Sequence, residues 1–217
     1  MAKVKIHSKE IPVKTIGRLS QYRRALLICT LKGKTHIFSH EIAAIQHVTA
    51  VQVRRDLMLI GFNGSLKQGY NIRNLIDVIS EILDYEEGVN VAIFGLGNFG
   101  RALFNYFYGK RSQLRIVATF DSNTEKIGTE YNKVYCYSPY RVEEIVKKKN
   151  IKIAILTVPP KRALEVAKKL VDAGIKGILN YTSTPIDVPD DVFLDEYDMI
   201  TTMEKAAFFV KMNELKL

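Results

Sequence analysis

Apolar side chains in the first 85 residues recur three or four positions apart, the spacing of one face of an α-helix. The pattern predicts four helices, and the two short ones in the middle are joined by a turn of three or four residues. Two short helices joined in this way form a helix-turn-helix. The predicted helices cover residues 15–31, a short segment from Ser39, residues 50–59 and residues 71–85.

Polar residues at two helix starts and a turn-rich segment refine this prediction. Ser39 is expected to cap the second helix, with apolar residues up to Ile45 on its inner face. Thr49 is expected to cap the third, and Gln52 three positions later completes a capping box. Turns rich in Gly and Asn on both sides of Lys67 predict a β-hairpin, the wing of a winged-helix domain.

From residue 86 onwards, strands alternate with helices. The strands are short and almost continuously apolar, which is typical of a parallel sheet covered on both faces. The alternation therefore predicts a doubly wound, Rossmann-type α/β domain behind the winged helix. The expected strands are 89–94, 115–120, 134–137, 151–157 and 177–180, and the expected helices are 98–109, 140–149 and 161–173.

The last stretch, residues 200–217, is predicted to be a helix with a broad apolar face that includes Phe208 and Phe209. Such a helix must bury that face, either on its own sheet or on a second subunit, and packing on its own sheet is the commoner outcome. The chain is accordingly divided into residues 1–85, 86–199 and 200–217.

Composition limits the classes of protein that fit these elements. The chain has 217 residues, of which 47% are hydrophobic and 25% charged, as in an ordinary soluble globular protein. No apolar run suits a membrane span and no signal peptide is recognisable, so a cytoplasmic location is expected. Cys29 and Cys136 lack paired spacing and are expected to be buried thiols rather than a disulfide or a metal site.

The positive charge is concentrated in the first part of the chain. Residues 1–85 hold 13 Lys and Arg against 6 Asp and Glu, whereas residues 86–217 hold 19 against 17. A basic module suits a polyanion, and phosphate contacts supply much of the affinity for DNA. The alternative at this point is a basic surface that is merely solvated.

A glycine-rich segment matches the dinucleotide-binding pattern G-x-G-x-x-G. It follows an apolar strand and opens a helix, which is the context that the pattern requires. The glycines permit a tight turn, close approach to a pyrophosphate and close helix–strand packing, and the helix N-terminus attracts phosphate. The segment consists of Gly95, Leu96, Gly97, Asn98, Phe99 and Gly100.

Asp121 ends the second predicted strand, 21 residues after Gly100, near the spacing expected for a carboxylate that binds the adenosine ribose. A carboxylate there repels a 2′-phosphate, and no Arg follows it closely, so NAD(H) is favoured over NADP(H). The alternative is a Rossmann domain that binds no nucleotide.

Residues that carry out catalysis are not evident in the predicted Rossmann domain. All four histidines lie within residues 1–85, and Cys136 has no nearby activating partner. Tyr106 and Lys110 have the spacing of a reductase pair but are interpreted as a core aromatic and a surface lysine. No metal-ligand cluster is found. The pattern favours a sensor with no catalytic residues; the alternative is a small NAD-dependent oxidoreductase with a basic N-terminal extension.

The third predicted helix has a basic outer face and an inner face that includes Val51. Arg54 and Arg55 have side chains that bind guanine or phosphate, and Gln52 has one that reads adenine. Gln52 cannot both cap the helix and read a base. In the wing, Lys67 is expected to contact phosphate or the minor groove. The alternative is that these charges are simple surface residues.

With these residues assembled, the chain resembles the Rex family of redox-sensing repressors over nearly its whole length. The resemblance implies a homodimer whose terminal helix crosses into the partner, bound to an inverted-repeat operator in double-stranded DNA. It also implies that NADH releases the DNA and that NAD⁺ does so poorly. The segments that carry the resemblance are 11–12, 18–19 with Tyr22, 51–57, 69–71, 95–103, 155–159 and 174–180.

The resemblance also implies roles for individual residues. Met199 matches the residue that enters the partner's nicotinamide pocket, Asp198 matches the one that meets Tyr106 across the interface, and Arg18 matches a basic residue that the switch frees or ties. The matching segments add Thr157, Val158, Pro159 and Asn180 to the expected cofactor contacts, and Arg18 and Tyr70 to the expected DNA contacts, which also include Thr49.

Two positions depart from the family pattern. Met199 stands where Phe or Leu is usual, and Met is the softer side chain. The wing has Ser65-Leu66-Lys67 where adjacent basic residues are usual, so Lys67 is expected to act alone.

Overall fold

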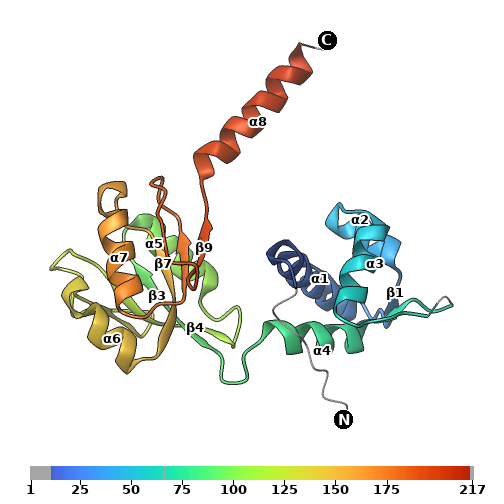
Figure 1. The fold of residues 1–217 in the computed structure, drawn as a ribbon, viewed down its shortest axis with the longest axis horizontal. Coiled ribbons are helices and arrows are strands. Elements are labelled where there is room, and N and C mark those ends of the chain that lie inside the picture. Colours follow the sequence, from blue (N-terminus) through green and yellow to red (C-terminus); the bar gives the residue numbers. More distant parts are fainter. Residues whose placement is uncertain (1–10, 66, 216–217) are drawn as a thin grey trace. The chain divides into compact units, whose positions relative to one another are not determined.

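The computed structural model describes residues 11–65 and 67–215. The chain divides into two compact units, and the boundary in the sequence lies between Tyr85 and Glu86 (Figure 1). This is where the hydrophobic pattern changes from helical to alternating strand and helix. Each unit buries its own set of apolar side chains and is described by itself.

The first unit is a helix-turn-helix supported by two further helices. Helix α1 packs against α4, and α2 packs against α3. The turn from α2 to α3 is tight because His47 adopts a left-handed conformation, with φ of 52°. The elements are α1 Val13–Leu31, β1 His36–Ile37, α2 Ser39–Gln46, α3 Ala50–Leu59, β2 Tyr70–Asn71 and α4 Ile72–Leu83.

The start of α2 differs from the prediction. Phe38, not Ser39, is the N-cap residue, and its backbone N–H donates to the Glu41 carboxylate at 2.9 Å. Ser39 is the first helical residue, and its hydroxyl accepts a hydrogen bond from Arg54 at 3.0 Å. Ile45 is 47% exposed, so it does not lie on the inner face. The Glu41 carboxylate thus satisfies the N–H of the N-cap residue, which is a different donor from those that a capping Ser39 hydroxyl would have satisfied.

The start of α3 confirms half of the predicted capping box. The Thr49 hydroxyl accepts from the Gln52 backbone N–H at 3.1 Å. The Gln52 side chain turns instead to Asp56, at 3.0 Å, so the reciprocal bond is not made. Val51 is 51% exposed and lies outside the core, whereas Val53 is fully buried.

The wing is a short turn whose ends pair with each other. Ser65 and Gly69 exchange two backbone hydrogen bonds of 2.9 and 2.8 Å, and Leu66 between them lies outside the described residues. The next residues form β2, which pairs antiparallel with β1. The sequence pattern did not reveal this small sheet, because two-residue strands are too short for an alternation to show.

The second unit is built on a mainly parallel sheet. Within the described residues its strand order is β5-β6-β4-β3-β7-β8-β9, and only the β5–β6 pair is antiparallel. The strands are β3 Val89–Phe94, β4 Leu114–Phe120, β5 Glu130–Tyr131, β6 Val134–Tyr137, β7 Ile151–Leu156, β8 Gly177–Asn180 and β9 Phe193–Glu196.

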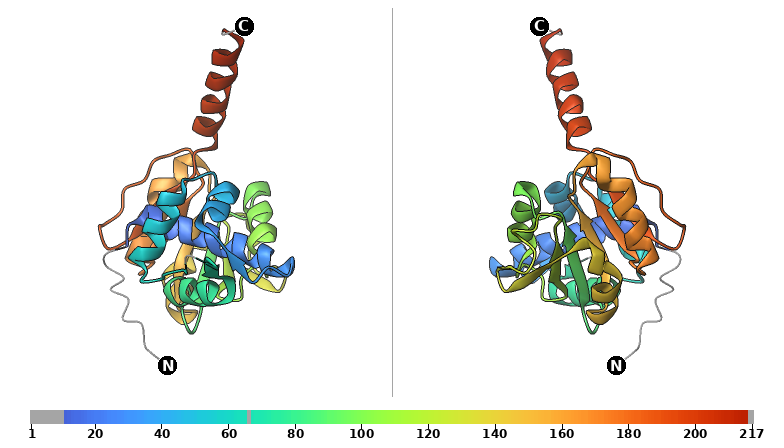
Figure 2. Two further views of the ribbon diagram at one scale, coloured as in Figure 1. Left: turned by 90° about the vertical axis from the view of Figure 1, so that its right-hand side faces the viewer. Right: turned by 90° about the vertical axis from the view of Figure 1, so that its left-hand side faces the viewer.

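Helices cover both faces of this sheet (Figure 2). Alternate residues of β3 point in opposite directions: Ala92 and Phe94 join the core under α6 and α7, whereas Val91 and Ile93 join the core with Phe104 of α5. This two-sided burial explains why the strands read as continuous apolar runs. The helices are α5 Asn98–Phe107, α6 Val142–Lys148 and α7 Ala163–Asp172.

Several details of the second unit were not predicted. Short 3₁₀ turns at Pro139–Arg141 and Pro160–Arg162 lead into α6 and α7, so the α-helices begin later than expected. The edge strands β5 and β9 were missed. Strand β9 has mainly exposed side chains, because it lies at the end of the sheet order. Two of its four residues are acidic, so it lacks the continuous apolar pattern of a buried strand.

The last helix, α8 Met199–Glu214, buries none of its residues. Its apolar side chains are largely exposed, with Met203 at 72% and Phe209 at 65%. The packing on its own sheet that was favoured on general grounds is therefore not observed. Residues 216 and 217 of the predicted helix lie outside the described residues. Among the helices described, none is long and apolar enough to cross a membrane.

Candidate functional site

The glycine-rich segment forms the turn between β3 and α5, and its backbone needs glycine at two points. Gly95 has φ of 99°, and a Cβ there would lie 2.7 Å from the Thr157 carbonyl oxygen. A Cβ on Gly100 would lie 1.9 Å from the Gly95 carbonyl oxygen. Gly97, by contrast, faces open space with no protein atom near its hypothetical Cβ. The segment thus packs tightly on one side and leaves its backbone accessible at Gly97.

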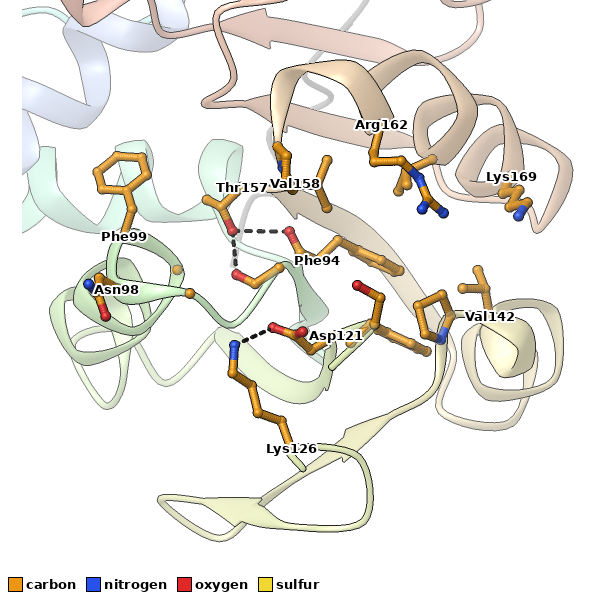
Figure 3. A pocket seen from close by; sticks show the side chains of 18 residues that line it. Phe94, Asn98, Phe99, Asp121, Lys126, Val142, Thr157, Val158, Arg162 and Lys169 are labelled. Atoms are coloured by element: carbon orange, nitrogen blue, oxygen red, sulfur yellow. Dashed lines mark hydrogen bonds and ion pairs between the residues drawn. The ribbon is translucent and has the colours of Figure 1, made fainter. Parts of the chain in front are cut away.

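A pocket of about 420 Å³ lies beside this turn, at the carboxyl ends of β3, β4 and β7 (Figure 3). Strand β3 has β4 on one side and β7 on the other, so this is the switch point where a doubly wound sheet binds its ligand. The pocket contains these residues expected from the sequence: Gly95, Gly97, Asn98, Phe99, Gly100, Asp121, Thr157, Val158 and Pro159.

Three residues expected to contact a cofactor do not line this pocket. Leu96 is 2% exposed and supports the site through its backbone N–H, which donates to Asp121 at 2.8 Å. Asn180 is buried, and its amide is hydrogen-bonded to Thr182 and Thr184 in the loop after β8 and to Glu196 at the end of β9. Met199 is 62% exposed at the start of α8.

Asp121 is held by three donors at the end of β4. Its Oδ2 accepts from the Leu96 N–H at 2.8 Å and from the Lys126 ammonium at 2.9 Å, and its Oδ1 accepts from the Asn123 N–H at 2.8 Å. Burial by itself would raise the pKa of this carboxyl, but these hydrogen bonds outweigh it and hold the pKa below its usual value. Asp121 is therefore a carboxylate at neutral pH.

Sequence reasoning missed about half of the pocket wall. Phe94, Phe120, Pro139, Val142 and Val166 form an apolar slot, in which the Phe94 and Phe120 rings stack with centroids 4.4 Å apart. Phe94 and Phe120 were expected only as residues of apolar strands, and the other three were not singled out in the sequence. The polar residues that were missed are Ser122, Lys126, Arg162 and Lys169.

The basic residues of the pocket differ in their partners. Arg162 and Lys169 both pair with the exposed carboxylate of Glu165, at 3.0 and 2.8 Å. Lys126 pairs with Asp121 itself. Its position five residues after the carboxylate expected to bind the ribose was the one signal in the sequence that would have pointed to it, because Lys is a common phosphate-binding residue.

The first unit offers a basic face along α3 and the wing. Arg54, Arg55 and Lys67 are exposed, and so is Thr49 at the start of α3. Arg54 donates a hydrogen bond to Ser39 at 3.0 Å. These residues can reach a ligand outside the unit.

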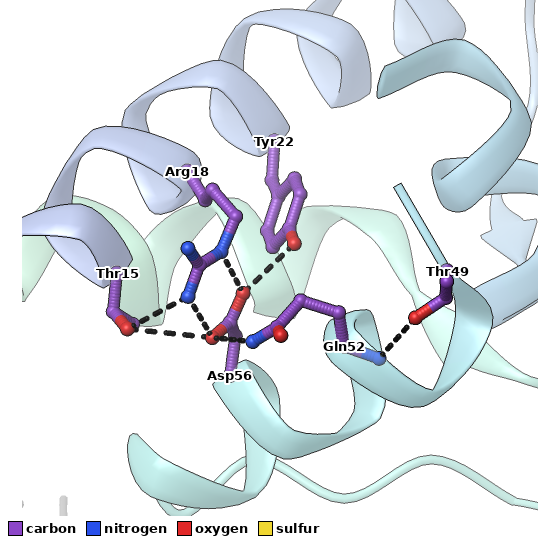
Figure 4. A network of polar contacts seen from close by, with 6 residues as sticks. All are labelled: Thr15, Arg18, Tyr22, Thr49, Gln52 and Asp56. Carbon is purple, nitrogen blue, oxygen red and sulfur yellow. Dashed lines mark hydrogen bonds and ion pairs between the residues drawn. The ribbon is translucent and has the colours of Figure 1, made fainter. Parts of the chain in front are cut away.

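Three other residues expected to contact DNA have side chains that pack against or hydrogen-bond to other residues of the first unit. Tyr70 is 9% exposed and packs in the core beside Phe62, because β2 pairs with β1 and turns its ring inwards. Arg18 and Gln52 both donate to the buried carboxylate of Asp56 (Figure 4). Neither side chain is free to meet a base in this arrangement.

Asp56 is the centre of a polar network between α1 and α3. Its side chain is 3% exposed, and it accepts two hydrogen bonds from Arg18, at 2.6 and 2.7 Å, and one from the Tyr22 hydroxyl at 2.9 Å. Burial would raise the pKa of Asp56, but the hydrogen bonds from Arg18, Tyr22 and Gln52 prevail and lower it. Burial and the bond to Asp56 raise the pKa of Tyr22.

The residues expected to act between subunits lie on the surface of the second unit. Tyr106 is 55% exposed, so its interpretation as a core aromatic is wrong, and the Lys110 ammonium lies 3.6 Å from its ring centroid. Asp198 is the N-cap residue of α8 and accepts from the Ile200 N–H at 2.9 Å. Among the described residues no hydrogen bond joins Tyr106 to Asp198.

The thiols and acidic residues form neither a disulfide nor a metal-binding group among the described residues. Burial raises the pKa of the Cys136 thiol, which disfavours the thiolate, and both Cys136 and Cys29 are free. Over residues 11–65 and 67–215, no three His, Cys, Asp or Glu side chains come together in a group that could hold a metal ion.

Two family models match different parts of the chain. The model described as a CoA binding domain matches residues 86–184, and the model described as the N-terminus of a putative DNA-binding protein matches residues 10–57. The matches correspond to the two units of the structure.

Curated relatives match nearly the whole chain. A redox-sensing transcriptional repressor Rex from Bacillus licheniformis is 36% identical over 205 residues, covering 94% of this chain and 95% of the relative. A redox-sensing transcriptional repressor Rex from Carboxydothermus hydrogenoformans is 38% identical over 202 residues, covering 93% and 97%.

Solved structures match with the same coverage. The chain is similar to RSP in complex with NAD⁺ and operator DNA, with a TM-score of 0.87, 31% identity and 94% of each chain covered. It is also similar to RSP in complex with NADH, with a TM-score of 0.83, 31% identity, and 95% and 97% of the two chains covered. RSP is described as a Rex-family repressor.

Proposed function

The chain belongs to the Rex family of redox-sensing transcriptional repressors, and we propose that its second unit binds NADH and NAD⁺ while its first unit binds operator DNA. The observation that carries the proposal is that one chain holds both features. The second unit has a pocket lined by the glycine-rich turn and by Asp121, and the first unit has a helix-turn-helix with exposed Arg54 and Arg55. The similarity to RSP with NAD⁺ and operator DNA supports the pairing of these two ligands.

The pocket fits a dinucleotide by its shape and by its donors. Open space over Gly97 admits a pyrophosphate, and the N-terminus of α5 presents free backbone N–H groups to it. The apolar slot beside Phe120 and Val142 accommodates the adenine, and Asp121 accepts a ribose hydroxyl. The bound cofactor supplies a nicotinamide ring that is neutral when reduced and positively charged when oxidised.

The proposed DNA-binding face consists of Thr49, Arg54, Arg55 and Lys67. Thr49 and the two arginines lie at the start and along the outer face of α3, the second helix of the helix-turn-helix, which enters the major groove in this motif. A homodimer presents two such helices, so the expected target is an inverted repeat in double-stranded DNA. We assign direct contacts to these residues rather than to Tyr70, whose ring is buried.

Dimerisation is proposed to occur through α8, which buries none of its residues in this chain. Crossing into the partner covers its apolar face and brings Met199 towards the partner's nicotinamide site. An apolar side chain there favours the neutral ring of NADH, because burying an unpaired charge is costly. Tyr106 is exposed and available to meet Asp198 of the partner subunit.

NADH is proposed to select a closed dimer whose two recognition helices are wrongly spaced for the operator. Arg18 is assigned to this switch because its partner Asp56 also holds Gln52 of α3. The cofactor then acts as a signal and the protein is not an enzyme. Because operator DNA lies in the cytoplasm, the protein acts there.

Fluorescence anisotropy of a labelled palindromic operator tests the proposal at one fixed salt concentration, since DNA affinity depends steeply on salt. NADH is titrated into the protein–operator complex, and NAD⁺ into a parallel sample. NADH is expected to release the DNA at a lower concentration than NAD⁺. If saturating NADH releases no DNA from the complex, the proposed switch is contradicted. Steady consumption of NADH with a small carbonyl compound contradicts the assignment as a sensor.

A further inference from the structure

The lysine that pairs with Asp121 belongs to the nucleotide pocket itself. Lys126 follows β4 in the loop before β5, and its ammonium lies 2.9 Å from Asp121 Oδ2 (Figure 3). The two side chains are 23% and 10% exposed, and both line the pocket. The carboxylate assigned to the adenosine ribose is therefore one half of an ion pair.

The hydrogen bonds of Asp121 leave it little capacity for a ribose. A carboxylate has about four acceptor positions. Leu96 and Lys126 occupy Oδ2, and Asn123 occupies one position on Oδ1. One ribose hydroxyl can bind to Oδ1 with the ion pair intact. The Lys126 ammonium has further N–H donors for an oxygen at the same place on the ribose.

The ion pair also changes the electrostatics of this position. An isolated carboxylate would repel a 2′-phosphate, which was the basis for favouring NAD(H) from the sequence. The pair formed by Asp121 and Lys126 is neutral overall, so charge repulsion alone is a weaker barrier. Arg162 and Lys169, the other basic residues among the described lining residues, are paired with Glu165 on α7.

We propose that Lys126 is a specificity-determining residue of the adenosine ribose site, and that Asp121 disfavours NADPH largely by binding the Lys126 ammonium and withholding it from a 2′-phosphate. The proposal rests on the proposed binding of NAD(H) in this pocket. It gives Lys126 a role in specificity that is not part of the glycine motif or of the acidic residue after the second strand. Removing Asp121 then does more than weaken NADH binding, because it frees a phosphate-binding group.

Calorimetric titrations of the full chain with NADH and with NADPH test this. Asp121→Asn is expected to weaken NADH binding and to strengthen NADPH binding by about tenfold, the size of one hydrogen bond to a charged group. The double variant Asp121→Asn/Lys126→Met is expected to lose that gain. Lys126→Met alone is expected to raise the NADH/NADPH affinity ratio by about tenfold, whereas Lys126→Arg retains the wild-type ratio.

Lys168→Met is the matched control, since it removes the same charge from an exposed position on α7 outside the pocket. Circular dichroism of each variant checks folding. The proposal is overturned if Asp121→Asn and the double variant bind NADPH equally, or if Lys126→Met weakens both dinucleotides equally, as a purely structural ion pair would. Wild-type protein that binds neither dinucleotide contradicts the proposed function instead.

Discussion

Arg18 of α1 donates two hydrogen bonds, of 2.6 and 2.7 Å, to the buried carboxylate of Asp56 on α3. The same carboxylate accepts from Gln52, which lies one helical turn earlier on the recognition helix. The position of the Gln52 side chain therefore depends on a residue of α1 with which it shares an acceptor. A change that withdraws Arg18 removes a polar contact between α1 and α3 and alters the hydrogen-bond partners open to Gln52.

Replacing Arg18 with Met is expected to destabilise the protein by about 3 kcal/mol, because the Asp56 carboxylate stays buried without its ion-pair partner. The free energy of unfolding in urea measures the effect. Arg24→Met, which removes an exposed arginine from the same helix, serves as the control and should change little. A loss below about 1 kcal/mol for Arg18→Met, the value of a surface pair, would show that the network is not tightly coupled.

Acid is expected to remove the stabilisation that Asp56 provides. Its pKa in the folded chain lies below the ordinary value of 3.8, so its contribution is present above that value and is lost as the pH falls through the folded pKa. The difference in unfolding free energy between wild type and Asp56→Asn should therefore be largest near neutral pH and shrink below pH 3.8. The prediction is contradicted if this difference in unfolding free energy stays constant down to about pH 2.

Gly97→Ala is expected to weaken NADH binding by about tenfold or more while leaving the thermal midpoint nearly unchanged, because the new methyl meets the pyrophosphate and no protein atom. Calorimetry with NADH and a thermal melt check the two parts. Gly17→Ala is the control, since its Cβ also meets open space but lies on α1, in the other unit. Equal NADH affinity in both variants would exclude the assigned cofactor position.

Arg55→Ala is expected to weaken operator binding and to lower the dependence of affinity on salt by about one released ion, if the side chain contacts phosphate. NADH affinity should not change, because Arg55 belongs to the first unit. Anisotropy measured at several salt concentrations gives both values. Arg141→Ala, an exposed arginine of the second unit, is the matched control. An equal loss of operator affinity in the two variants would indicate only a general charge effect.

Phe209→Glu is expected to shift the protein from dimer to monomer, because it places a charge in the exposed apolar face of α8. Sedimentation velocity at several protein concentrations reports the change. Glu204→Gln on the same helix alters charge without disturbing an apolar side chain and should remain dimeric. A dimer that survives Phe209→Glu at low concentration would place the interface elsewhere.

Local patterns in the sequence determined much of this protein. Helical spacing located α1 to α4, and Thr49 caps α3 as expected. The glycine spacing from Gly95 to Gly100 indicated the turn that borders the pocket, because Gly95 needs a positive φ and Gly100 packs against the Gly95 carbonyl oxygen. These features depend on residues a few positions apart, whose relationship is set by backbone geometry alone.

The tertiary structure decided which polar side chains are free. Arg18 and Gln52 had the side chains of DNA-binding residues, but a carboxylate 38 positions from Arg18 engages both. Lys126 became part of the ribose site only when the loop after β4 brought it to Asp121. Burial and ion pairing depend on contacts between distant segments. The sequence therefore showed which functional groups are present, whereas only the tertiary structure showed which residues they bind.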